Sequence, residues 1–524
     1  MVKYCVRVEI PFLKFEDHHL QPWIDSMQPT FQIKGLHTIC DDEVKMYKGM
    51  KKDIEVELQN LDSRICLTSD MWTSSQDLGY MCITAHYINV EFNYKKKTIS
   101  LAEVKYPHTG YAIEEEIVRS LTEWGIRGKL FTLTLDNASN NTNTCEELIK
   151  YHKHELLLEG QHLHVKCCAH ILNILVQDGM KIIHEAIDMI RELMKYIDSP
   201  PSRIQDFNTI ASGMALRAKK GISVDTLTRW NSTWKMLVEA LTYKSVLTSY
   251  ANRKMIDSPS EEEWDKAKAI CEFLKAFEEL TLIVSAHRKP TSHKFLSVVL
   301  SIRHALKDPG WQTSDVLKEL AAVMQTKLDK YWDPEEKENA DPNRRRKSKG
   351  IEFNHALIIA TFLDPRRKEE LLVFLLLQVV YRRGENYETS GDCFRMGEKV
   401  WKRKLEEEFA QHKSRRRSRV HKSKLDAYLK EASEKVGDDF DVLGWWKKHG
   451  EKFPLLASMA RDFLAIPLST MASESAFGCG KRILGDKRSS LNPDMLELLV
   501  CAKDWLFKPK EGELTTYILV LLLV

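Results

Sequence analysis

Two aspartates in this sequence stand where carboxylates could bind a divalent cation. Asp70 ends a short apolar segment, residues 63–70, and Asp136 ends another, residues 130–136. Two carboxylates held close together repel each other, so such a pair either shares a proton or binds a cation. Carboxylate oxygens suit Mg²⁺ or Mn²⁺, and two such ions can activate a water and stabilise the leaving oxygen of a phosphodiester. The alternative is that each aspartate only caps the turn after its own segment.

A cysteine and a histidine three positions apart form a second candidate site. Cys167 and His170 follow two further histidines, His162 and His164. Cysteine and histidine are the ligands that zinc prefers, but a structural zinc site needs a second ligand pair at loop spacing, and none is evident. The alternative is a buried thiol beside a histidine that hydrogen-bonds locally and orients an acidic neighbour. We therefore expect no zinc in this chain.

Aromatic and basic residues point to a third kind of chemistry, contact with nucleic acid. Arg229 precedes Trp230 in the segment TRWNST, and Trp72 lies two positions after Asp70. An arginine beside an aromatic ring suits a phosphate contact and a stacked, flipped base, although a tryptophan is more often a core residue. Two basic runs could contact phosphates or direct nuclear import, or could be solvated loops: 344–349 (RRRKSK, with Arg344, Arg345 and Arg346) and 413–424 (KSRRRSRVHKSK, with Arg415, Arg416 and Arg417).

The pattern of apolar residues predicts the elements that must position these side chains. Three strands of an antiparallel meander are followed by alternating helices and strands: strands 63–70, 80–90 and 97–106, helix 112–124, strand 130–136, helix 142–157, strand 162–168 and helix 170–197. This order is the layout of a ribonuclease-H-like α/β core with a mixed five-stranded sheet. In that layout the first and fourth strands are neighbours, so Asp70 and Asp136 would meet at adjacent strand ends.

The remainder of the chain is predicted to be mostly helical. A helical lead-in covers 41–61, and strand patterns nearly vanish between about 200 and 435, which indicates a large all-α insertion. One helix of that insertion, 258–285, starts with the capping-box pair Ser260 and Glu263. Residues 440–507 again look compact and end in a helix, 492–506.

Composition narrows the classes of protein that this chain can be. Its 524 residues suggest about three domains, and 43% hydrophobic with 29% charged residues excludes disorder over the whole length. The 78 basic and 75 acidic residues nearly balance, so any basic function must be local. Eleven scattered cysteines without a signal peptide indicate reduced thiols. The longest apolar stretches are too short to span a bilayer, so we expect no membrane partner.

Taken together, these segments resemble the hAT superfamily of transposases, closest to the plant Ricesleeper/Daysleeper-like group. The segments that carry the resemblance fall in family order: 63–72, 80–86, 136–141, 164–176 (HVKCCAHILNILV), 228–233 (TRWNST) and 438–506. The last of these contains IPLSTMASESAFGCGKRILGDKRSS, which looks like the C-terminal hAT dimerisation region.

The resemblance implies a role for individual residues. It implies a DDE triad of Asp70, Asp136 and Glu474, which would bind Mg²⁺ or Mn²⁺ for cut-and-paste transfer of DNA. Trp230 matches an aromatic that stacks on a flipped base, and Trp72 matches an aromatic near the first acid. Cys167 and His170 match a CxxH motif near the active site. For dimerisation we expect burial of five aromatic side chains: Trp445, Trp446, Phe453, Phe463 and Trp505.

The expected organisation follows from the same resemblance. A ribonuclease-H-like core is interrupted by the helical insertion and completed by the C-terminal region. The expected boundaries are 1–60 (helical lead-in), 61–200 (first part of the core), 201–437 (insertion with basic loops), 438–507 (hAT dimerisation region) and 508–524 (an atypical tail). Family members usually carry an N-terminal BED zinc finger, and this sequence starts after the place where the finger would lie.

Three functions are compatible with these features. The first is a domesticated, transposase-derived nuclear protein that binds DNA and dimerises with itself or with related hAT proteins through its C-terminal region. The second is an active hAT transposase, which retention of all three acids favours. The third is a dimerisation module only, which needs just the 438–507 region.

Overall fold

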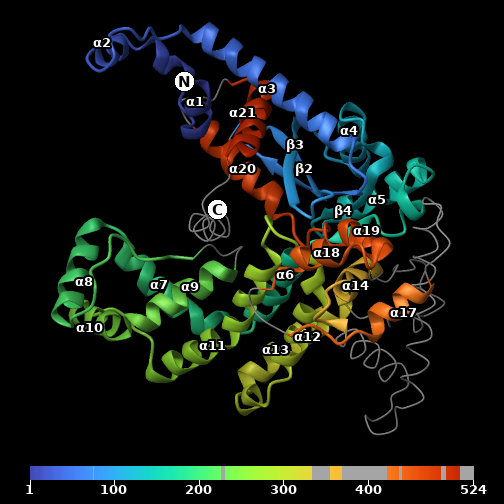
Figure 1. Ribbon diagram of the computed structural model, residues 1–524. Coiled ribbons are helices and arrows are strands. Elements are labelled where there is room, and N and C mark those ends of the chain that lie inside the picture. Colours follow the sequence, from blue (N-terminus) through green and yellow to red (C-terminus); the bar gives the residue numbers. More distant parts are fainter. Residues whose placement is uncertain are drawn as a thin grey trace, which may run out of the picture. The chain divides into compact units, whose positions relative to one another are not determined.

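A computed structural model describes residues 1–74, 76–225, 230–332, 354–368, 422–435, 440–485 and 491–507 (Figure 1). These residues form two compact units. The first contains residues 1–167, 286–295 and the described residues from 354 onward, and the second contains 168–285 and 296–332. The second unit therefore begins directly after Cys167, and the chain returns twice to the first unit.

The first unit is built on one sheet whose strands follow the predicted order. The described strands are β1 (Ile65–Thr73), β2 (Gly79–Ile88), β3 (Tyr94–Glu103), β4 (Leu130–Leu135) and β5 (His164–Lys166). They pair in the order β3-β2-β1-β4-β5. β1 is antiparallel to β2 and parallel to β4, and β4 is parallel to β5. The predicted mixed five-stranded sheet, with its first and fourth strands adjacent, is confirmed.

One face of the sheet is covered by three helices: α3 (Leu36–Gln59), α4 (Gly110–Glu123) and α5 (Ser139–His152). The alternation of side chains along a strand sends Leu67 and Ile83 to this face, where they join Ile117 of α4 in one apolar cluster. Thr109 caps α4, because its side chain accepts a hydrogen bond from the backbone N–H of Ala112. The covering helices are thus amphipathic elements that bury one face each.

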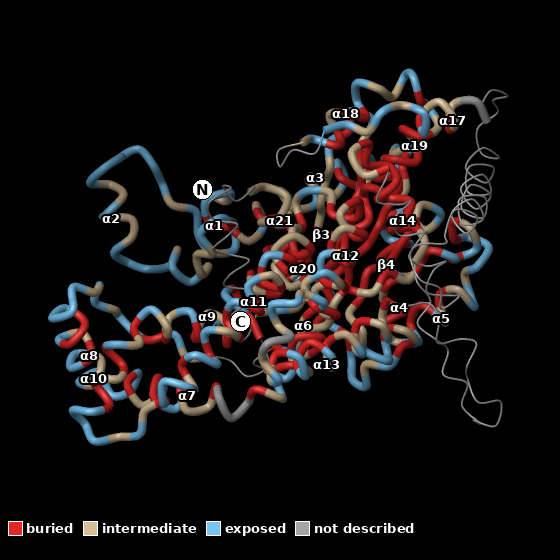
Figure 2. The backbone as a smooth tube through the Cα atoms, turned by 90° about the horizontal axis from the view of Figure 1, so that it is seen from below, coloured by how far each residue is buried: buried red, intermediate tan, exposed pale blue. Residues whose placement is uncertain are grey.

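The opposite face is covered by helices from the far end of the sequence, α20 (Met471–Ile483) and α21 (Pro493–Leu506), and by α1 (Val2–Val8). Cys82 of β2 and Phe477 of α20 belong to the apolar cluster on this side, together with Val6 of α1. Figure 2 shows the buried residues concentrated in this layered unit, whereas α2 (Leu20–Asp25) contains no buried residue. The short helix η1 (Phe12–Glu16) links α1 and α2.

Four further helices complete the described part of the first unit: α14 (His355–Phe362), α17 (Lys422–Lys430), α18 (Val442–His449) and α19 (Pro454–Phe463). Trp446 of α18 lies at their centre with no exposed surface. Its indole Nε1 donates to the carbonyl oxygen of Leu363 at 2.8 Å, and its ring packs against Tyr428. A buried tryptophan with a satisfied N–H fixes these helices to one another.

The described residues of the second unit form helices and connecting segments and contain no strand. Its helices are α6 (Cys168–Met180), α7 (His184–Asp198), α8 (Pro201–Gly213), α9 (Trp230–Thr242), α10 (Lys244–Lys254), α11 (Glu261–Val284), α12 (Phe295–Leu306) and α13 (Asp315–Trp332). The capping box at Ser260 and Glu263 is present at the start of α11, which confirms that prediction.

The prediction of one long helix over 170–197 was wrong. The chain breaks after Met180 and restarts at His184. Gly179, a poor helix former, lies next to the break, and a β-carbon there would come within 2.8 Å of Leu320 and Met324 of α13. A larger residue at this position would force the side chains of Leu320 and Met324 to shift.

The described cysteines are free thiols. Among the described helices, none combines the length and apolar character needed to cross a membrane.

Candidate active site

Strand register brings Asp70 and Asp136 to the same face of the sheet. β1 and β4 are paired with Thr68 opposite Thr134. Two positions further along each strand, on the same face, come Asp70 and Asp136. β1 runs on past Asp70 to Thr73, so Asp70 lies within its strand and only Asp136 follows the end of its own. The prediction that the two acids meet through adjacent strands thus agrees with the register.

The start of α20 lies over this face and brings a third carboxylate. Ser473, fully buried, donates from its hydroxyl to the hydroxyl of Thr68 at 3.3 Å, across a separation of 405 residues in sequence. Thr134 donates to the carbonyl oxygen of Pro467 at 3.0 Å. Glu474 follows Ser473 in the first turn of α20. Sequence pattern could not show that this glutamate returns to the two aspartates, because several hundred residues intervene.

The negative charges of the other two carboxylates act on Asp70. Burial raises its pKa well above the ordinary value, and the negative charges of Glu474 and Asp136 raise it further, in that order. One of its oxygens accepts the backbone N–H of Met71 at 2.8 Å, which acts in the opposite direction. Carboxylates that repel one another in a partly buried place favour a proton or a cation between them.

The carboxylates are not arranged as a finished metal cage. Within the residues that the structure describes, no group of three or more His, Cys, Asp or Glu side chains could hold a metal ion. The donor set itself consists of the hard oxygens that Mg²⁺ and Mn²⁺ prefer. The oxygen ligands of these residues therefore fit a divalent cation. A bound ion would have to draw the three carboxylate side chains closer together.

Asp136 also makes the local contacts that the turn-capping alternative predicts. Its Oδ1 accepts the backbone N–H of Ala138 at 2.9 Å and the side-chain amide of Asn141 at 2.5 Å. The turn-capping alternative therefore describes part of what Asp136 does. Capping a turn and binding a metal ion do not exclude each other. Asn141 was not among the predicted site residues, although an amide five positions after the acid, on the next helix, is visible in the sequence.

Cys167 connects the end of β5 to the start of α20. Its backbone N–H donates to the carbonyl oxygen of Leu135, the residue before Asp136, at 2.8 Å. Its buried sulfur accepts from the backbone N–H of Thr470 at 3.5 Å and from its hydroxyl at 3.6 Å. Thr470 is the residue that precedes α20. Cys167 thus helps to position the helix that carries Glu474, and its role near a catalytic site stays a prediction.

Comparison with known proteins places these features in a family. Four family models match the chain: the ZBED1 RNase-like domain at 68–162, the ZBED1 RNase-like helical domain at 165–273, the hAT-like transposase RNase-H fold at 293–396, and the hAT family C-terminal dimerisation region at 424–506. The "Zinc finger BED domain-containing protein RICESLEEPER 2" of Oryza sativa subsp. japonica is 32% identical, over 97% of this chain and 74% of that protein.

The chain belongs to the hAT family. It is also similar to the "Putative AC transposase" of Zea mays, with 31% identity over 96% of this chain, and spans 64% of the length of that protein. The "Zinc finger BED domain-containing protein DAYSLEEPER" of Arabidopsis thaliana is 28% identical over 97% of this chain and 73% of that protein. The resemblance inferred from the motifs is thereby confirmed.

The aromatic residues expected to mediate hAT dimerisation are packed within the single chain. Trp446, Phe453 and Phe463 have no exposed surface, and Trp445 is 8% exposed. Trp505 is half-buried and stacks on Tyr47 of α3 at 5.2 Å between ring centroids. These side chains hold the matched dimerisation region to its own core. Their part in self-association stays a prediction, and it would act through the fold of the region.

Two tryptophans expected at a DNA interface are packed against protein in this structure. Trp72 is half-buried, with its ring 5.8 Å from that of Phe477 and against Gly480, both on α20. Trp230 is the first residue of α9 and is 2% exposed. A ring buried to this extent would have to turn outward before it could stack on a base, so contact of these two residues with DNA stays a prediction.

An ion pair in the second unit holds Asp225 against α7. Arg191 of α7 binds Asp225 through two parallel hydrogen bonds of 2.8 and 2.9 Å. Asp225 also accepts the hydroxyl of Thr233 at 2.7 Å. Arg229 lies outside the described residues, as do the two basic runs with Arg344, Arg345, Arg346, Arg415, Arg416 and Arg417. His170 lies on α6, in the second unit, and is partly exposed.

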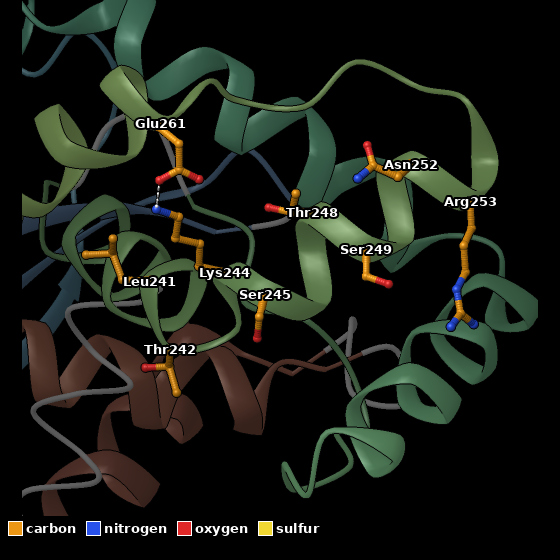
Figure 3. Close-up of a pocket in the computed structure, with 9 residues that line it drawn as sticks. All are labelled: Leu241, Thr242, Lys244, Ser245, Thr248, Ser249, Asn252, Arg253 and Glu261. Atoms are coloured by element: carbon orange, nitrogen blue, oxygen red, sulfur yellow. Dashed lines mark hydrogen bonds and ion pairs between the residues drawn. The ribbon is translucent and has the colours of Figure 1, made fainter.

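The second unit also contains a pocket of about 760 Å³. Figure 3 shows it between the end of α9, one face of α10 and the start of α11, with Lys244 and Glu261 joined by an ion pair of 2.6 Å. Its walls are mostly alcohol, amide and charged side chains, and it includes no predicted site residue: Leu241, Thr242, Lys244, Ser245, Thr248, Ser249, Asn252, Arg253 and Glu261.

Proposed function

We propose that this hAT protein is a transposase-derived nuclear protein that binds DNA and acts as a dimer. Family membership and the match to the hAT dimerisation region over 424–506 support the proposal. The observation from the structure that carries it furthest is that Glu474 lies over the sheet face that bears Asp70 and Asp136. A cluster of carboxylates in this position is suited to metal-assisted contact with a phosphodiester.

DNA strand cleavage is the second candidate function, because all three acids are retained on one face. Asp70, Asp136 and Glu474 would hold Mg²⁺ or Mn²⁺, which when bound supplies an activated water and stabilises the leaving oxygen. Asn141 orients one oxygen of Asp136 and leaves its other oxygen for a ligand. Cys167 and Ser473 keep the first turn of α20 against the strand ends, and so keep Glu474 in reach.

The two functions are separated by one experiment on the full chain. Binding of duplex DNA and Mg²⁺- or Mn²⁺-dependent nicking are measured for the wild type, Asp136→Asn and a control, Asp41→Asn, which changes an exposed acid on α3. Asparagine can still accept the hydrogen bond from Ala138, so the local fold is kept. Nicking by the wild type and the control that is lost in Asp136→Asn establishes the nuclease.

The other outcomes are equally decisive. DNA binding without nicking in any variant supports a domesticated binding protein. Neither binding nor nicking removes both proposals and leaves dimerisation as the remaining activity. Light scattering on the same samples tests the dimer independently, since a monomeric mass at micromolar concentration would contradict it.

A further inference from the structure

One side chain next to the candidate acids is enclosed at its polar end and makes no hydrogen bond. Asn137 directly follows Asp136, and both polar atoms of its amide, Oδ1 and Nδ2, are buried without a partner. The residue as a whole is only partly buried, so the amide is its enclosed end. Buried polar atoms are nearly always hydrogen-bonded in folded proteins, and an exception calls for a water, an ion or another ligand that satisfies it.

The connection that carries Asn137 is held at both ends. On one side lies β4, which pairs with β1 and β5, and the carbonyl oxygen of Leu135 accepts the backbone N–H of Cys167 at 2.8 Å. On the other side α5 is tied to the residues before α4, because Asn140 donates its side-chain amide to the carbonyl oxygen of His108 at 3.0 Å. The enclosed amide of Asn137 is therefore part of a fixed link between the sheet and α5.

The hydrogen bonds of the two aspartates leave one oxygen of each for a ligand. Oδ1 of Asp136 accepts the N–H of Ala138 and the side-chain amide of Asn141, so the turn is capped without help from Asn137. Oδ1 of Asp70 accepts the backbone N–H of the residue that follows it. Among the described residues, none donates a hydrogen bond to the Oδ2 of either aspartate.

A divalent cation held by two carboxylate oxygens still needs further oxygen ligands. Mg²⁺ and Mn²⁺ accept carbonyl oxygens and waters alongside carboxylates. Each added carboxylate strengthens the repulsion by which Glu474 and Asp136 already raise the pKa of Asp70. An amide oxygen is neutral, so it supplies a ligand without adding to that repulsion. The amide N–H₂ can donate at the same time to a phosphate oxygen of DNA.

We propose that Asn137 is a further residue of the cation site, where its Oδ1 supplies a neutral oxygen to the divalent cation that Asp70 and Asp136 would hold. The inference rests on the proposed function, because it adds a residue to the site at which strand cleavage is proposed. It also gives the enclosed amide a partner. Its sequence signal is the Asp-Asn pair that opens the segment DNASNN at 136–141.

Mn²⁺ binding to the full chain tests the proposal without any need for nuclease activity. Electron paramagnetic resonance of free Mn²⁺ gives the dissociation constants of the wild type, Asn137→Leu and Asn143→Leu, a control that changes an exposed asparagine of α5. Loss of a side chain that supports a metal site typically weakens binding about 10- to 100-fold. We expect this loss in Asn137→Leu and not in the control. Asp136→Asn should weaken binding too, which identifies the measured ion as the one at this site.

Thermal unfolding in EDTA separates an amide that binds a ligand from one with a structural role. Leucine is similar in size and leaves no polar atom unpaired, so Asn137→Leu should unfold in EDTA at the wild-type temperature or above it. Mn²⁺ should raise the unfolding temperature of the wild type and raise that of the variant less. A lower unfolding temperature of Asn137→Leu in EDTA, together with wild-type affinity for Mn²⁺, would show that an ordered water satisfies the amide and would overturn the proposal.

A second variant keeps the oxygen and changes the charge. Asn137→Asp should unfold at a lower temperature in EDTA, because its carboxylate lies next to Asp136 in sequence and like charges repel. It should bind Mn²⁺ at least as tightly as the wild type does. Binding as weak as that of Asn137→Leu would contradict a role of Oδ1 as a ligand.

The same measurements distinguish failure of the inference from failure of the proposed function. If the wild type and Asn137→Leu bind Mn²⁺ equally while Asp136→Asn does not, the acids hold the ion without Asn137, and only the inference fails. If the wild type does not bind Mn²⁺, or if Asp136→Asn binds it as the wild type does, no cation is held at the acids. Strand cleavage and the inference then fail together, whereas DNA binding is measured separately.

Discussion

Substitution of Asp504 tests how the C-terminal helix is held to the sheet. α21 lies along β3, which is the edge strand. One oxygen of Asp504 accepts the backbone N–H of Thr98 at 2.8 Å, and the other binds Lys96 at 2.8 Å. The side chains of Asp504 and Lys96 are only 12% and 7% exposed. Trp505 donates its indole N–H to the carbonyl oxygen of Thr98 at 2.8 Å, so α21 satisfies part of the open edge of β3.

The expected cost of Asp504→Asn follows from this burial. Asparagine can still accept the N–H of Thr98, but the ammonium group of Lys96 stays buried without a counter-charge. Breaking a buried ion pair by removing one partner costs about 3–5 kcal/mol. Asp504→Leu loses the hydrogen bond to Thr98 as well, for roughly 1–3 kcal/mol more. The double variant Lys96→Met/Asp504→Leu removes both charges and should recover most of the loss.

Urea unfolding gives the free energies, and hydrogen exchange of the amides of Thr98 and Leu101 localises the effect to β3. Leu101 donates its N–H to Glu497 of α21 at 3.1 Å, so it reports on the same contact. Asp494→Asn, an exposed acid at the start of the same helix, is the matched control and should cost less than about 1 kcal/mol. The reasoning is refuted if Asp504→Asn is within about 1 kcal/mol of the wild type, or if the double variant is no more stable than the single ones.

Two further predictions concern a histidine and a tryptophan of the first unit. Burial, followed by the charge of Lys166, lowers the pKa of His164 to about 4. The imidazole therefore binds a proton near pH 6.5 in the unfolded chain but stays neutral in the folded chain until about pH 4. The free energy of unfolding consequently falls as the pH drops from 6.5 to about 4, by roughly 3 kcal/mol. His164→Gln should lose less stability than the wild type between pH 7 and 4.5 in urea unfolding; parallel curves would contradict this. Trp446→Ala removes a fully buried indole and should cost about 3–5 kcal/mol. We expect self-association to weaken with it, and an unchanged mass in light scattering of folded protein would count against a role of this core in dimerisation.

The buried aromatic residues of the matched dimerisation region affect how deletion experiments on hAT dimerisation can be interpreted. Trp446, Phe453 and Phe463 fill the interior of their own chain. Deletion of the region would therefore remove α20 and α21 from the sheet and expose the edge of β3, which invites aggregation. Loss of dimerisation after such a deletion would not by itself identify the interface.

Much of the fold was predictable because its signals are local. The alternation in β1 to β3 and the capping pair at Ser260 and Glu263 each involve neighbours in sequence, and each is found as predicted. The break between α6 and α7 was not predicted, because apolar periodicity continues across residues 181–183. The partial burial of Trp72 and the burial of Trp230 were left open by the sequence, since an indole can pack in a core or contact a base.

The sequence by itself indicated the family and most of the order of strands and helices, and the family resemblance singled out three acids as candidates. Tertiary structure alone decided that the first turn of α20, which carries Glu474, lies over the sheet face of Asp70, because that placement depends on hydrogen bonds between residues hundreds of positions apart, such as Thr68 with Ser473. It also decided that Lys96 of β3 and Asp504 of α21, far apart in the sequence, form an ion pair of 2.8 Å with little exposed surface. Charges separated along a chain carry no pattern until folding brings them within a few ångströms, where their mutual energy becomes large in a poorly hydrated place.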